Sequence, residues 1–287
     1  MKGFLWDQVC FYGEMAAKQR LDLQLLTLGL VESRQQAQQL IRAGKVRDIR
    51  GQLLDKPGMD VRIDCELKVE QPPRFVSRGG YKLLAGLEAF SIEVDGRVCL
   101  DGGISTGGFT DCLLQHGASR VYGVDVGYGQ TAWSLRTDNR LVLRERTNLR
   151  HLEASSLYQD DDPWPTLAVT DVSFISLRLI LPALRRLLSD EDPEALVLIK
   201  PQFEVGKGRV GKGGVVRDQT AHLDAIESVL AAASQLDWYP QGIVASPITG
   251  PAGNHEYVLW LAARQPTTQL PTLKLLIAET FASTLKN

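Results

Sequence analysis

A short apolar run that ends in an acid and a glycine-rich turn constrains this chain most. Residues 98–109 read V-C-L-D-G-G-I-S-T-G-G-F, and an amphipathic segment, Phe109 to His116, comes next. This pattern predicts a buried strand, a tight turn and the start of a helix. Glycine tolerates positive φ and lets backbone approach a ligand closely, and a helix start offers unpaired N–H groups. The stretch therefore predicts a turn that can hold a small ligand.

The spacing of the glycines in this turn distinguishes between three known kinds of ligand-binding motif. A dinucleotide fingerprint needs G-x-G-x-x-G, and a phosphate loop needs Lys-Ser/Thr after its last glycine, and neither is present here. The pattern D-x-G-x-S-x-G-G from Asp101 to Gly108 is instead similar to the first motif of S-adenosylmethionine-dependent methyltransferases. A second apolar run, R-V-Y-G-V-D, ends in Asp125, whose carboxylate is placed to accept the ribose hydroxyls of an adenosine ligand. The alternative is that both acids only cap loops.

Composition sets the scale of the fold and excludes some classes of protein. A length of 287 residues suggests two domains, or a large domain with a small one. The four cysteines (10, 65, 99 and 112) form no C-x-x-C pair, which favours free thiols in a reducing cytoplasm over a zinc site, so no metal is expected. No apolar run approaches about 18 residues, so neither a membrane span nor a signal peptide is expected.

The first 14 residues differ in character from the rest of the chain. They read M-K-G-F-L-W-D-Q-V-C-F-Y-G-E, which is rich in aromatic residues and too short to bury them. Met15 begins a more typical opening, M-A-A-K-Q-R-L-D. We therefore expect either that Met15 is the natural start or that residues 1–14 are a poorly ordered extension.

Residues 15–70 have the pattern of a small separate module. Leu21 and Leu25 share one face of a predicted helix, and Ser33 is the candidate N-cap of a second helix. Short strands are predicted in V-R-D-I, Q-L-L and L-K-V-E. Basic residues gather around the second helix and the strand after it, which indicates either an RNA-binding face or a solvated helix face.

The module resembles the RNA-binding domain named after ribosomal protein S-four, which also occurs in pseudouridine synthases. The match is R-L-D-x-x-L-x-x-x-G-L-x-x-S-R-x-x-A-x-x-L-I-x-x-G-x-V, and one departure is V-R-D-I-R-G in place of a short V-N-G hairpin. The resemblance implies that the following side chains face RNA: Arg20, Ser33, Arg34, Gln35, Arg42 and Lys45.

A proline-containing linker, residues 71–78, precedes a predicted larger domain at 79–264. Ser77 is predicted to cap a helix from Gly80 to Phe90, which contains Lys82. Apolar runs then alternate with helical patterns, which predicts a doubly wound sheet. The predicted strands are 98–101, 121–125, 141–144, 167–172, 195–200, 242–246 and 257–262, and the predicted helices are 109–116, 177–188 and 221–235. A tail, 265–287, contains one more predicted helix, 273–285.

Polar side chains stand where four of these strands end: Asp101, Asp125, Asp171 and Lys200. Ligands of doubly wound sheets bind beyond the carboxyl ends of the strands. A single polar residue at such an end is often only a cap, but four at different strand ends favour one shared site.

Most of the chain, about residues 16–264, resembles the TlyA-type ribosomal RNA 2′-O-ribose methyltransferases, a family often labelled haemolysin A. The matching runs include V-S-R-G-G-Y-K-L at 76–83, D-G-G-I-S-T-G-G-F-T-D at 101–111, V-D-V-G-Y-G-Q at 124–130 and I-K-P-Q-F-E at 199–204. The resemblance implies an α/β, Rossmann-like sheet of seven mostly parallel strands with the last strand antiparallel, after a small α+β RNA-binding domain. It also implies the Lys-Asp-Lys-Glu tetrad of the heat-shock-induced ribose methyltransferases, at Lys82, Asp171, Lys200 and Glu256.

The chemistry explains why such a tetrad is needed. A ribose 2′-hydroxyl is a poor nucleophile, and ammonium groups near its oxygen stabilise the negative charge that develops as its proton leaves. A lysine can take that proton only if its pKa is lowered by burial or by a second ammonium. The hypothesis is that Lys200 is the base, Lys82 the neighbouring cation, Asp171 the group that orients Lys200 near the methyl group, and Glu256 the group that positions Lys82 or the ribose. The sequence alone does not decide which of the two lysines is the base and which stabilises the charge.

The family pattern also implies a set of residues around S-adenosylmethionine. Asp125 would take the ribose hydroxyls and Val126 would pack near adenine. Asn148 would reach the adenine edge, or is simply a turn residue. The remaining implied contacts are Asp101, Gly103, Ser105, Thr106, Gly107, Gly108, Phe109 and Asp171.

Two other features suggest sites of a different kind. The run G-K-G-R-V-G-K-G at 206–213 nearly matches a phosphate loop, but Gly213 replaces the Ser or Thr and no helix start follows. A mobile basic loop that contacts RNA phosphates is the better interpretation, with these residues: Lys207, Arg209, Lys212 and Arg217. Arg78, outside this loop, is a further expected RNA contact. His255 has no partner at metal-ligand spacing, which favours a neutral structural histidine.

Taken together, these features predict a cytoplasmic enzyme that methylates a ribose 2′-hydroxyl, that of cytidine under the family precedent, in the ribosomal RNA of ribosomal subunits. A monomer or weak dimer is expected. Two alternatives stand beside it: a non-catalytic RNA-binding factor that retains the cofactor pocket, and a membrane-active haemolysin.

Overall fold

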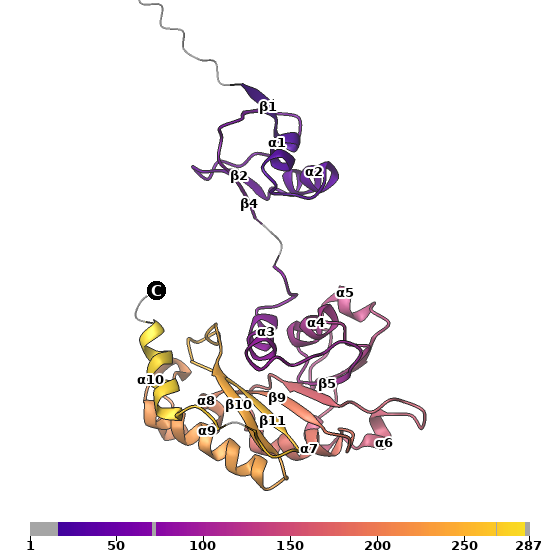
Figure 1. Cartoon of the computed structure of the whole chain (residues 1–287), viewed down its shortest axis with the longest axis vertical. Helices are drawn as coiled ribbons and strands as arrows, with labels where there is room; N and C mark the ends of the chain where they lie inside the picture. Colours follow the sequence, from indigo (N-terminus) through magenta and orange to yellow (C-terminus); the bar gives the residue numbers. More distant parts are fainter. Residues whose placement is uncertain (1–16, 71–72, 268, 285–287) are drawn as a thin grey trace, which may run out of the picture. The chain divides into compact units, whose positions relative to one another are not determined.

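The computed structural model describes residues 17–70, 73–267 and 269–284, which form two compact units divided between Pro73 and Arg74 (Figure 1). The expectations for residues 1–14 and for a start at Met15 lie outside the described residues. Each unit has a hydrophobic core of its own.

The first unit is a small α+β fold around two short helices. Its elements are β1 (Lys18–Arg20), α1 (Leu21–Thr27), α2 (Arg34–Arg42), β2 (Val46–Asp48), β3 (Asp60–Arg62) and β4 (Leu67–Val69). Strands β1 and β3 form one antiparallel pair, and β2 and β4 form another. Leucines and other apolar residues at helical spacing bury the inner faces, among them Leu21, Leu25, Ala37 and Ile41.

The predicted helix cap in this unit is confirmed, whereas the predicted strands are only partly correct. Ser33 caps α2, because its hydroxyl accepts a hydrogen bond from the Gln36 N–H at 3.2 Å. The predicted strand Q-L-L is wrong, since residues 52–54 contribute a single bridge between Leu53 and Arg47. Strands β1 and β3 were not predicted, because their sequences, K-Q-R and D-V-R, are mostly polar and show no strand pattern.

The second unit is built on a seven-stranded sheet of order β10-β11-β9-β8-β5-β6-β7. The strands are β5 (Val98–Gly102), β6 (Arg120–Val124), β7 (Leu141–Arg144), β8 (Leu167–Thr170), β9 (Glu194–Ile199), β10 (Tyr239–Ala245) and β11 (Tyr257–Ala262). The pairs from β7 through β9 are parallel, and β11 is antiparallel to both β9 and β10. The predicted seven-stranded sheet with an antiparallel last strand is confirmed.

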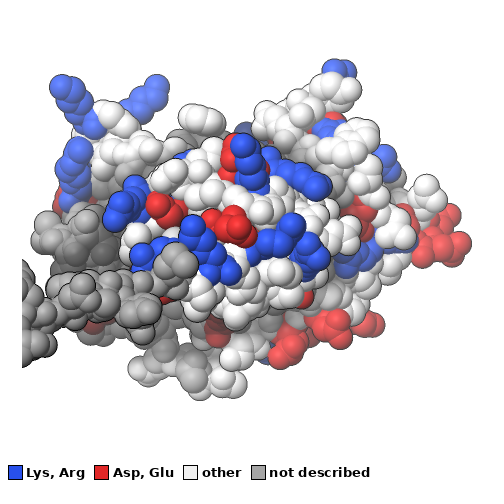
Figure 2. All heavy atoms as spheres, turned by 90° about the horizontal axis from the view of Figure 1, so that it is seen from above, with Lys and Arg blue, Asp and Glu red and all other residues white. Residues whose placement is uncertain are grey.

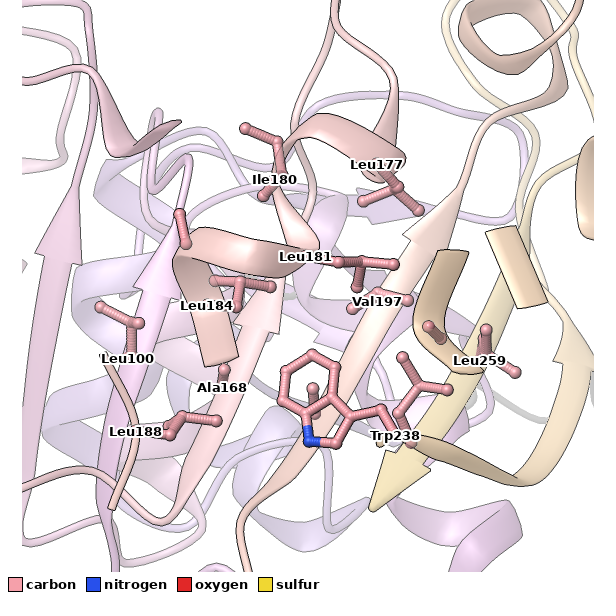
Figure 3. Close-up of a cluster of buried hydrophobic side chains, with 14 of the residues drawn as sticks. Leu100, Ala168, Leu177, Ile180, Leu181, Leu184, Leu188, Val197, Trp238 and Leu259 are labelled. Carbon is pink, nitrogen blue, oxygen red and sulfur yellow. The ribbon is translucent and has the colours of Figure 1, made fainter. Parts of the chain in front are cut away.

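Helices cover both faces of this sheet (Figure 1). They are α3 (Gly79–Phe90), α4 (Gly108–Gln115), α5 (Trp133–Arg136), α6 (Ala154–Leu157), α7 (Leu181–Arg186), α8 (Pro201–Glu204), α9 (Gln219–Ser234) and α10 (Leu273–Thr284). Side chains of α3 and α4 belong to one buried cluster, while those of α7 and α9 belong to another. Figure 3 shows the second cluster, where Trp238 packs among aliphatic side chains such as Leu184 and Val197.

Two expected helix starts in this unit are corrected. The predicted helix 177–188 is a 3₁₀ turn at Leu177–Leu179 followed by α7, because Pro182 has no N–H and a proline suits only the first turn of a helix. Ser77 does not cap α3 with its side chain; Arg78 is the N-cap residue, and the Ser77 carbonyl accepts the Gly80 N–H at 3.2 Å.

The sheet brings four strand ends to one edge. Asp101 lies one residue before the end of β5, and the residues that directly follow β6, β8 and β9 are Asp125, Asp171 and Lys200. These four strands are parallel, so their carboxyl ends face the same side of the unit. Strand β9 is buried along its whole length, which matches the apolar run A-L-V-L-I that follows Glu194.

Candidate active site

A cavity of about 550 Å³ opens along this edge of the sheet. It is lined by the glycine-rich turn, by the residues after β6 and β8, and by the start of α3. Most of the predicted cofactor residues are among its lining: Gly103, Ser105, Thr106, Gly108, Phe109, Asp125, Val126, Asn148 and Asp171. The cavity wall also includes Lys82 and Lys200.

The turn between β5 and α4 depends on left-handed backbone. Gly107 has φ 101° and is the N-cap residue of α4, and Ser105 adopts φ 49°. A Cβ at Gly107 would lie 2.2 Å from Cδ1 of Leu135, so any other residue there would strain the backbone and displace this leucine. Gly107 therefore shapes the turn without lining the cavity.

Asp125 is held by the backbone of two turns. The Ser105 N–H donates to Oδ2 at 2.7 Å, and the Gly127 N–H donates to Oδ1 at 2.6 Å. These bonds fix a carboxylate at the cavity wall with its remaining lone pairs free for hydroxyl donors. Asn148 lines the cavity, and its side-chain oxygen accepts the Arg150 N–H at 3.1 Å. That hydrogen bond is typical of a turn residue, and the contact with adenine stays a prediction.

Asp101 lies behind the cavity rather than in its wall. Its side chain is buried, Oδ2 accepts the Thr110 hydroxyl at 2.7 Å, and Oδ1 has no partner among the described residues. Burial raises the pKa of Asp101 to about 7, and the negative charge of Asp171 adds to that rise. Asp101 thus connects β5 with α4, the two elements on either side of the glycine-rich turn.

The four tetrad residues form one connected chain of charges. The Lys82 ammonium lies 2.6 Å from Oε2 of Glu256 and 3.6 Å from Oδ2 of Asp171. The Lys200 ammonium lies 2.6 Å from Oδ1 of the same Asp171. Two cations and two anions therefore alternate across the site.

The four side chains of the tetrad are buried to different degrees. Side-chain exposure is 1% for Glu256, 8% for Lys82, 9% for Lys200 and 21% for Asp171. The deepest member, Glu256, precedes β11, and Lys82 reaches it from α3. Asp171, the most exposed member, bridges the two lysines at the cavity wall.

Two residues that sequence reasoning did not select support this group. Ser173 accepts a hydrogen bond from the Lys200 ammonium at 2.8 Å. Glu204 accepts the Ser176 hydroxyl at 2.5 Å and the Leu177 N–H at 2.7 Å, and its side chain is 1% exposed. They lie in residues 170–177 and 199–204, where several other polar side chains stand beside them, so no local pattern set either residue apart.

In the first unit, one buried carboxylate organises two of the residues expected to contact RNA. Asp22 accepts hydrogen bonds from Arg20 at 3.0 and 2.9 Å, from Arg34 at 3.0 Å and from Gln38 at 2.9 Å. These donors hold the pKa of Asp22 well below its usual range. The two arginine side chains stay 43% and 50% exposed, so part of each guanidinium faces solvent.

The other residues expected to contact RNA lie at exposed or partly exposed positions. Lys45 pairs with Glu70 at 2.9 Å, and Arg209 contacts the carboxylates of Asp218 and Asp224. The remaining ones are Gln35, Arg42, Arg78, Lys207, Lys212 and Arg217, of which Arg78 lines the cavity. Figure 2 shows basic and acidic side chains intermingled on the surface in this view.

The two sequence features that suggested other sites have structural roles. Residues 206–213 contain a short 3₁₀ turn, Lys207–Arg209, rather than a phosphate loop that leads into a helix. His255 lies against the ring of Phe281, with a ring-centroid distance of 4.7 Å, and burial lowers its pKa. Within residues 17–70, 73–267 and 269–284, no three His, Cys, Asp or Glu side chains are arranged to hold a metal ion.

Known proteins share both units of this chain. The model of the FtsJ-like methyltransferase family matches residues 75–263, and that of the S4 domain matches residues 19–63. The 16S/23S rRNA (cytidine-2′-O)-methyltransferase TlyA of Mycobacterium tuberculosis is 50% identical over 249 residues, which cover 86% of this chain and 91% of the relative. Hemolysin A of Brachyspira hyodysenteriae is 38% identical over 239 residues, or 83% and 98% of the two chains.

A solved structure extends this similarity to three dimensions. It is described as a hemolysin from Streptococcus thermophilus and superposes with a TM-score of 0.70 at 40% identity, covering 95% of this chain and 98% of its own. Among the described residues, no helix is long and apolar enough to cross a membrane. The family matches, the seven-stranded sheet and the two-unit organisation show that this chain belongs to the TlyA family of FtsJ-like methyltransferases with an N-terminal S4 domain.

Proposed function

We propose that this protein transfers a methyl group from S-adenosylmethionine to the ribose 2′-hydroxyl of a cytidine in ribosomal RNA. The observation that supports this most directly is the alternating chain Glu256–Lys82–Asp171–Lys200 at the wall of a cavity beside a glycine-rich turn. The M. tuberculosis relative is named for this reaction. The proposed place of action is the cytoplasm, where ribosomal subunits are found.

The cavity fits S-adenosylmethionine in its donor set. Asp125 presents a fixed carboxylate for ribose hydroxyls, exposed Val126 offers an apolar surface for adenine, and the start of α4 offers N–H groups. When bound, this cofactor would supply an electrophilic methyl group on a sulfonium. Asp171 lies at the cavity wall between the turn and the two lysines, which suits a role beside that methyl group.

The residues of the tetrad have separable roles in this proposal. Lys200 acts as the base in its neutral amine form: it takes the proton from the 2′-hydroxyl and becomes the ammonium that Asp171 and Ser173 hold in place. Lys82 stabilises the negative charge that develops on the oxygen. Glu256 holds Lys82 through a buried ion pair, so it acts on the ribose site through that lysine.

The S4 domain supplies substrate binding in this proposal. Arg20 and Arg34 keep part of each guanidinium exposed while Asp22 fixes their orientation. Guanidinium groups held in this way suit RNA phosphates, because little side-chain entropy remains to be lost on binding. Ribosomal subunits, rather than small ligands, are thus the proposed partner.

Transfer of tritiated methyl groups to isolated ribosomal subunits tests the proposal. The wild-type protein should label ribosomal RNA, and nucleoside analysis should place the label on ribose rather than on a base. Lys200→Ala should abolish labelling while calorimetry still detects S-adenosylmethionine binding. Lys274→Ala, which removes an exposed lysine of α10, is the matched control and should label normally.

The alternatives predict different results in the same assay. A non-catalytic RNA-binding factor would bind subunits without any labelling by the wild-type protein. A membrane-active protein would release dye from lipid vesicles without labelling RNA. Unchanged labelling by Lys200→Ala would remove that residue as the base and return the role to Lys82.

A further inference from the structure

Residues 206–217, here called the basic arm, lie between α8 and α9 and are fastened to the second unit at a buried residue, Val216. Both polar groups of the Val216 backbone are bound by side chains. Its N–H donates to Oδ1 of Asn254 at 2.9 Å, and its carbonyl accepts a hydrogen bond from Nε2 of His222 at 3.0 Å. Neither Asn254 nor His222 has a part in the proposed methyl transfer.

Both of these side chains are themselves buried and held in place. His222, on α9, is 0% exposed, and its Nδ1 accepts the Tyr257 hydroxyl at 3.0 Å, so each ring nitrogen has a partner. Burial lowers the pKa of His222, which keeps the ring neutral. Asn254 is 2% exposed and also donates from Nδ2 to the Gly214 carbonyl at 2.8 Å. Two buried polar groups from different elements thus converge on one end of the basic arm.

The composition of the basic arm explains why it needs such an anchor. Five of the nine residues 206–214 are glycine, which loses more backbone freedom on ordering than any other residue. Arg209 contacts the carboxylates of Asp218 and Asp224, but those two side chains are more than half exposed, and exposed ion pairs contribute little. The buried hydrogen bonds at Val216 are therefore the stronger restraint on the arm.

The two ends of the basic arm are connected to the two ends of the tetrad. The arm begins six residues after Lys200. At its other end, the residues that fasten it through Val216 and His222 are Asn254 and Tyr257, which stand on either side of Glu256 in the sequence. The anchor therefore places the arm relative to the residues that the proposed reaction uses.

The basic arm carries three exposed positive charges, here called the arm cations: Lys207, Lys212 and Arg217. Unlike Arg209, none of the three forms an ion pair within the part of the chain that the structure describes. Cations without a carboxylate partner are available to RNA phosphates.

We propose that His222 and Asn254 are positioning residues for the RNA substrate, because they hold the basic arm in an arrangement that presents the arm cations to RNA phosphates beside the tetrad. Neither side chain touches RNA. Binding through a segment that is already ordered costs less free energy than binding through one that must first be ordered. The inference rests on the proposed function, since it assigns that reaction two further residues.

Methyl transfer to ribosomal subunits by variants of the full-length protein tests this role. His222→Ala should raise KM for subunits at least about tenfold, the equivalent of ordering about one more residue on binding, while kcat stays near wild type. His222→Gln keeps an N–H for the Val216 carbonyl and should recover most of the wild-type KM. Ser228→Ala removes a different hydrogen bond of α9, from its hydroxyl to the Ala225 carbonyl, and is the matched control with unchanged KM.

Coupling between the anchor and the arm cations separates positioning from a general loss of stability. Replacing the three arm cations by alanine should raise KM and reduce the salt dependence of subunit binding by about three phosphate contacts. The same replacement should have much less effect in the His222→Ala background, because the cations are no longer held in place. Equal effects in the two backgrounds, or wild-type KM in His222→Ala, would refute the inference. Thermal melting checks folding, and Asn254→Ala carries the same test from the other side of the anchor.

Direct binding of subunits, measured without methyl donor, separates this inference from the proposed function. If the wild-type protein transfers no methyl group but His222→Ala and Asn254→Ala still weaken subunit binding, the positioning role stands and the proposed function fails. If the wild-type protein transfers methyl groups and both variants bind subunits normally, the proposed function stands and the positioning role is refuted. The role is also refuted if both variants weaken only S-adenosylmethionine binding in calorimetry, because the anchor then acts on the cofactor site.

Discussion

The ammonium nitrogen of Lys82 lies 2.6 Å from Oε2 of Glu256, although 174 positions separate the two residues. Lys82 is on the first helix of the second unit, and Glu256 directly precedes the antiparallel strand β11. Both side chains are almost fully buried, so neither can exchange its partner for water. This contact therefore fixes the position of Lys82 in the site and also contributes to the stability of the second unit.

Glu256→Ala should destabilise the second unit and inactivate the protein. The substitution leaves a buried ammonium whose other carboxylate, Asp171, is 3.6 Å away. Removing one partner of a buried ion pair costs about 3–5 kcal/mol, because the other charge stays buried. Urea denaturation and methyl transfer to ribosomal subunits measure the two effects.

A control variant tests whether the destabilisation by Glu256→Ala comes from the lost Lys82 contact or simply from the loss of a negative charge. Glu227→Ala removes an exposed carboxylate of α9 and should change the free energy of unfolding by less than about 0.5 kcal/mol. Equal destabilisation by the two variants would contradict the importance of the Lys82 contact.

Glu204→Gln should lower kcat for methyl transfer with little change in KM for subunits. Glu204 and Lys200 lie one helical turn apart and hold the two ends of the loop from Asp171 to Leu177. Loss of the carboxylate weakens the charge-assisted bonds to Ser176 and the Leu177 N–H, so the loop that positions Lys200 becomes less well ordered. Steady-state kinetics checks this, and Glu204→Asp, which keeps the charge, should recover part of kcat. A rise in KM alone would instead indicate a role in substrate binding.

Sequence patterns predicted the strands of the second unit because they read as apolar runs, and five of them, β5, β6, β8, β9 and β11, are buried along almost their whole length. They also predicted that Asp125, Asp171 and Lys200 would share an edge, since parallel strands end on the same side. Glu256 was different: it precedes an antiparallel strand, and only the resemblance to a family connected it with Lys82. Contacts between distant elements depend on packing, which local patterns do not contain.

The same limit explains the residues that were missed or misplaced. Asp101 stands near the end of β5, yet its carboxylate accepts the Thr110 hydroxyl and does not line the cavity. Glu204 was not selected because a carboxylate in a short helix gives no local sign of burial.

The contribution of Asp101 to stability should fall as pH rises from about 4 to 7, and Asp101→Asn should remove that contribution to the pH dependence. Burial raises the pKa of Asp101 to about 7, so between about pH 4 and 7 the folded state binds this proton more tightly than the unfolded state. The folded state therefore loses its advantage as the proton leaves. Urea denaturation at pH 5.5, 6.5 and 7.5 measures the effect, and the difference between wild type and variant should change with pH. Parallel curves for the two proteins would refute it.

Gly107→Ala should destabilise the cofactor turn far more than Gly129→Ala. Both glycines have left-handed backbone, with φ values of 101° and 75°. A Cβ at Gly107 would collide with Leu135, whereas nothing lies within 4 Å of a Cβ at Gly129. The second variant therefore carries only the backbone cost of about 1–2 kcal/mol, and the first adds a core displacement. Thermal melting and S-adenosylmethionine calorimetry compare them; similar losses in both would show that Leu135 moves aside freely.

Asp22→Asn should weaken the first unit, and Asp64→Asn should not. The two acids pair with Arg20 and Arg62 in the same arrangement, two residues apart with two hydrogen bonds each. Asp22 is buried and also binds Arg34, whereas the Asp64 side chain is 55% exposed. Losing hydrogen bonds to charged groups at the buried site should cost roughly 2 kcal/mol.

Hydrogen exchange of α1 and α2 amides in the full-length chain measures this difference and adds a pH test. The pKa of Asp22 is lowered in the folded state, so its contribution is present above its unfolded pKa of about 4 and is lost as pH falls below that value. Wild-type protection should therefore approach that of Asp22→Asn on acidification, while Asp64→Asn should follow wild type throughout. Subunit binding should weaken in parallel for Asp22→Asn alone, because Arg20 and Arg34 lose the carboxylate that orients them. Normal binding by a less protected Asp22→Asn would separate the fold of this unit from its contact with RNA.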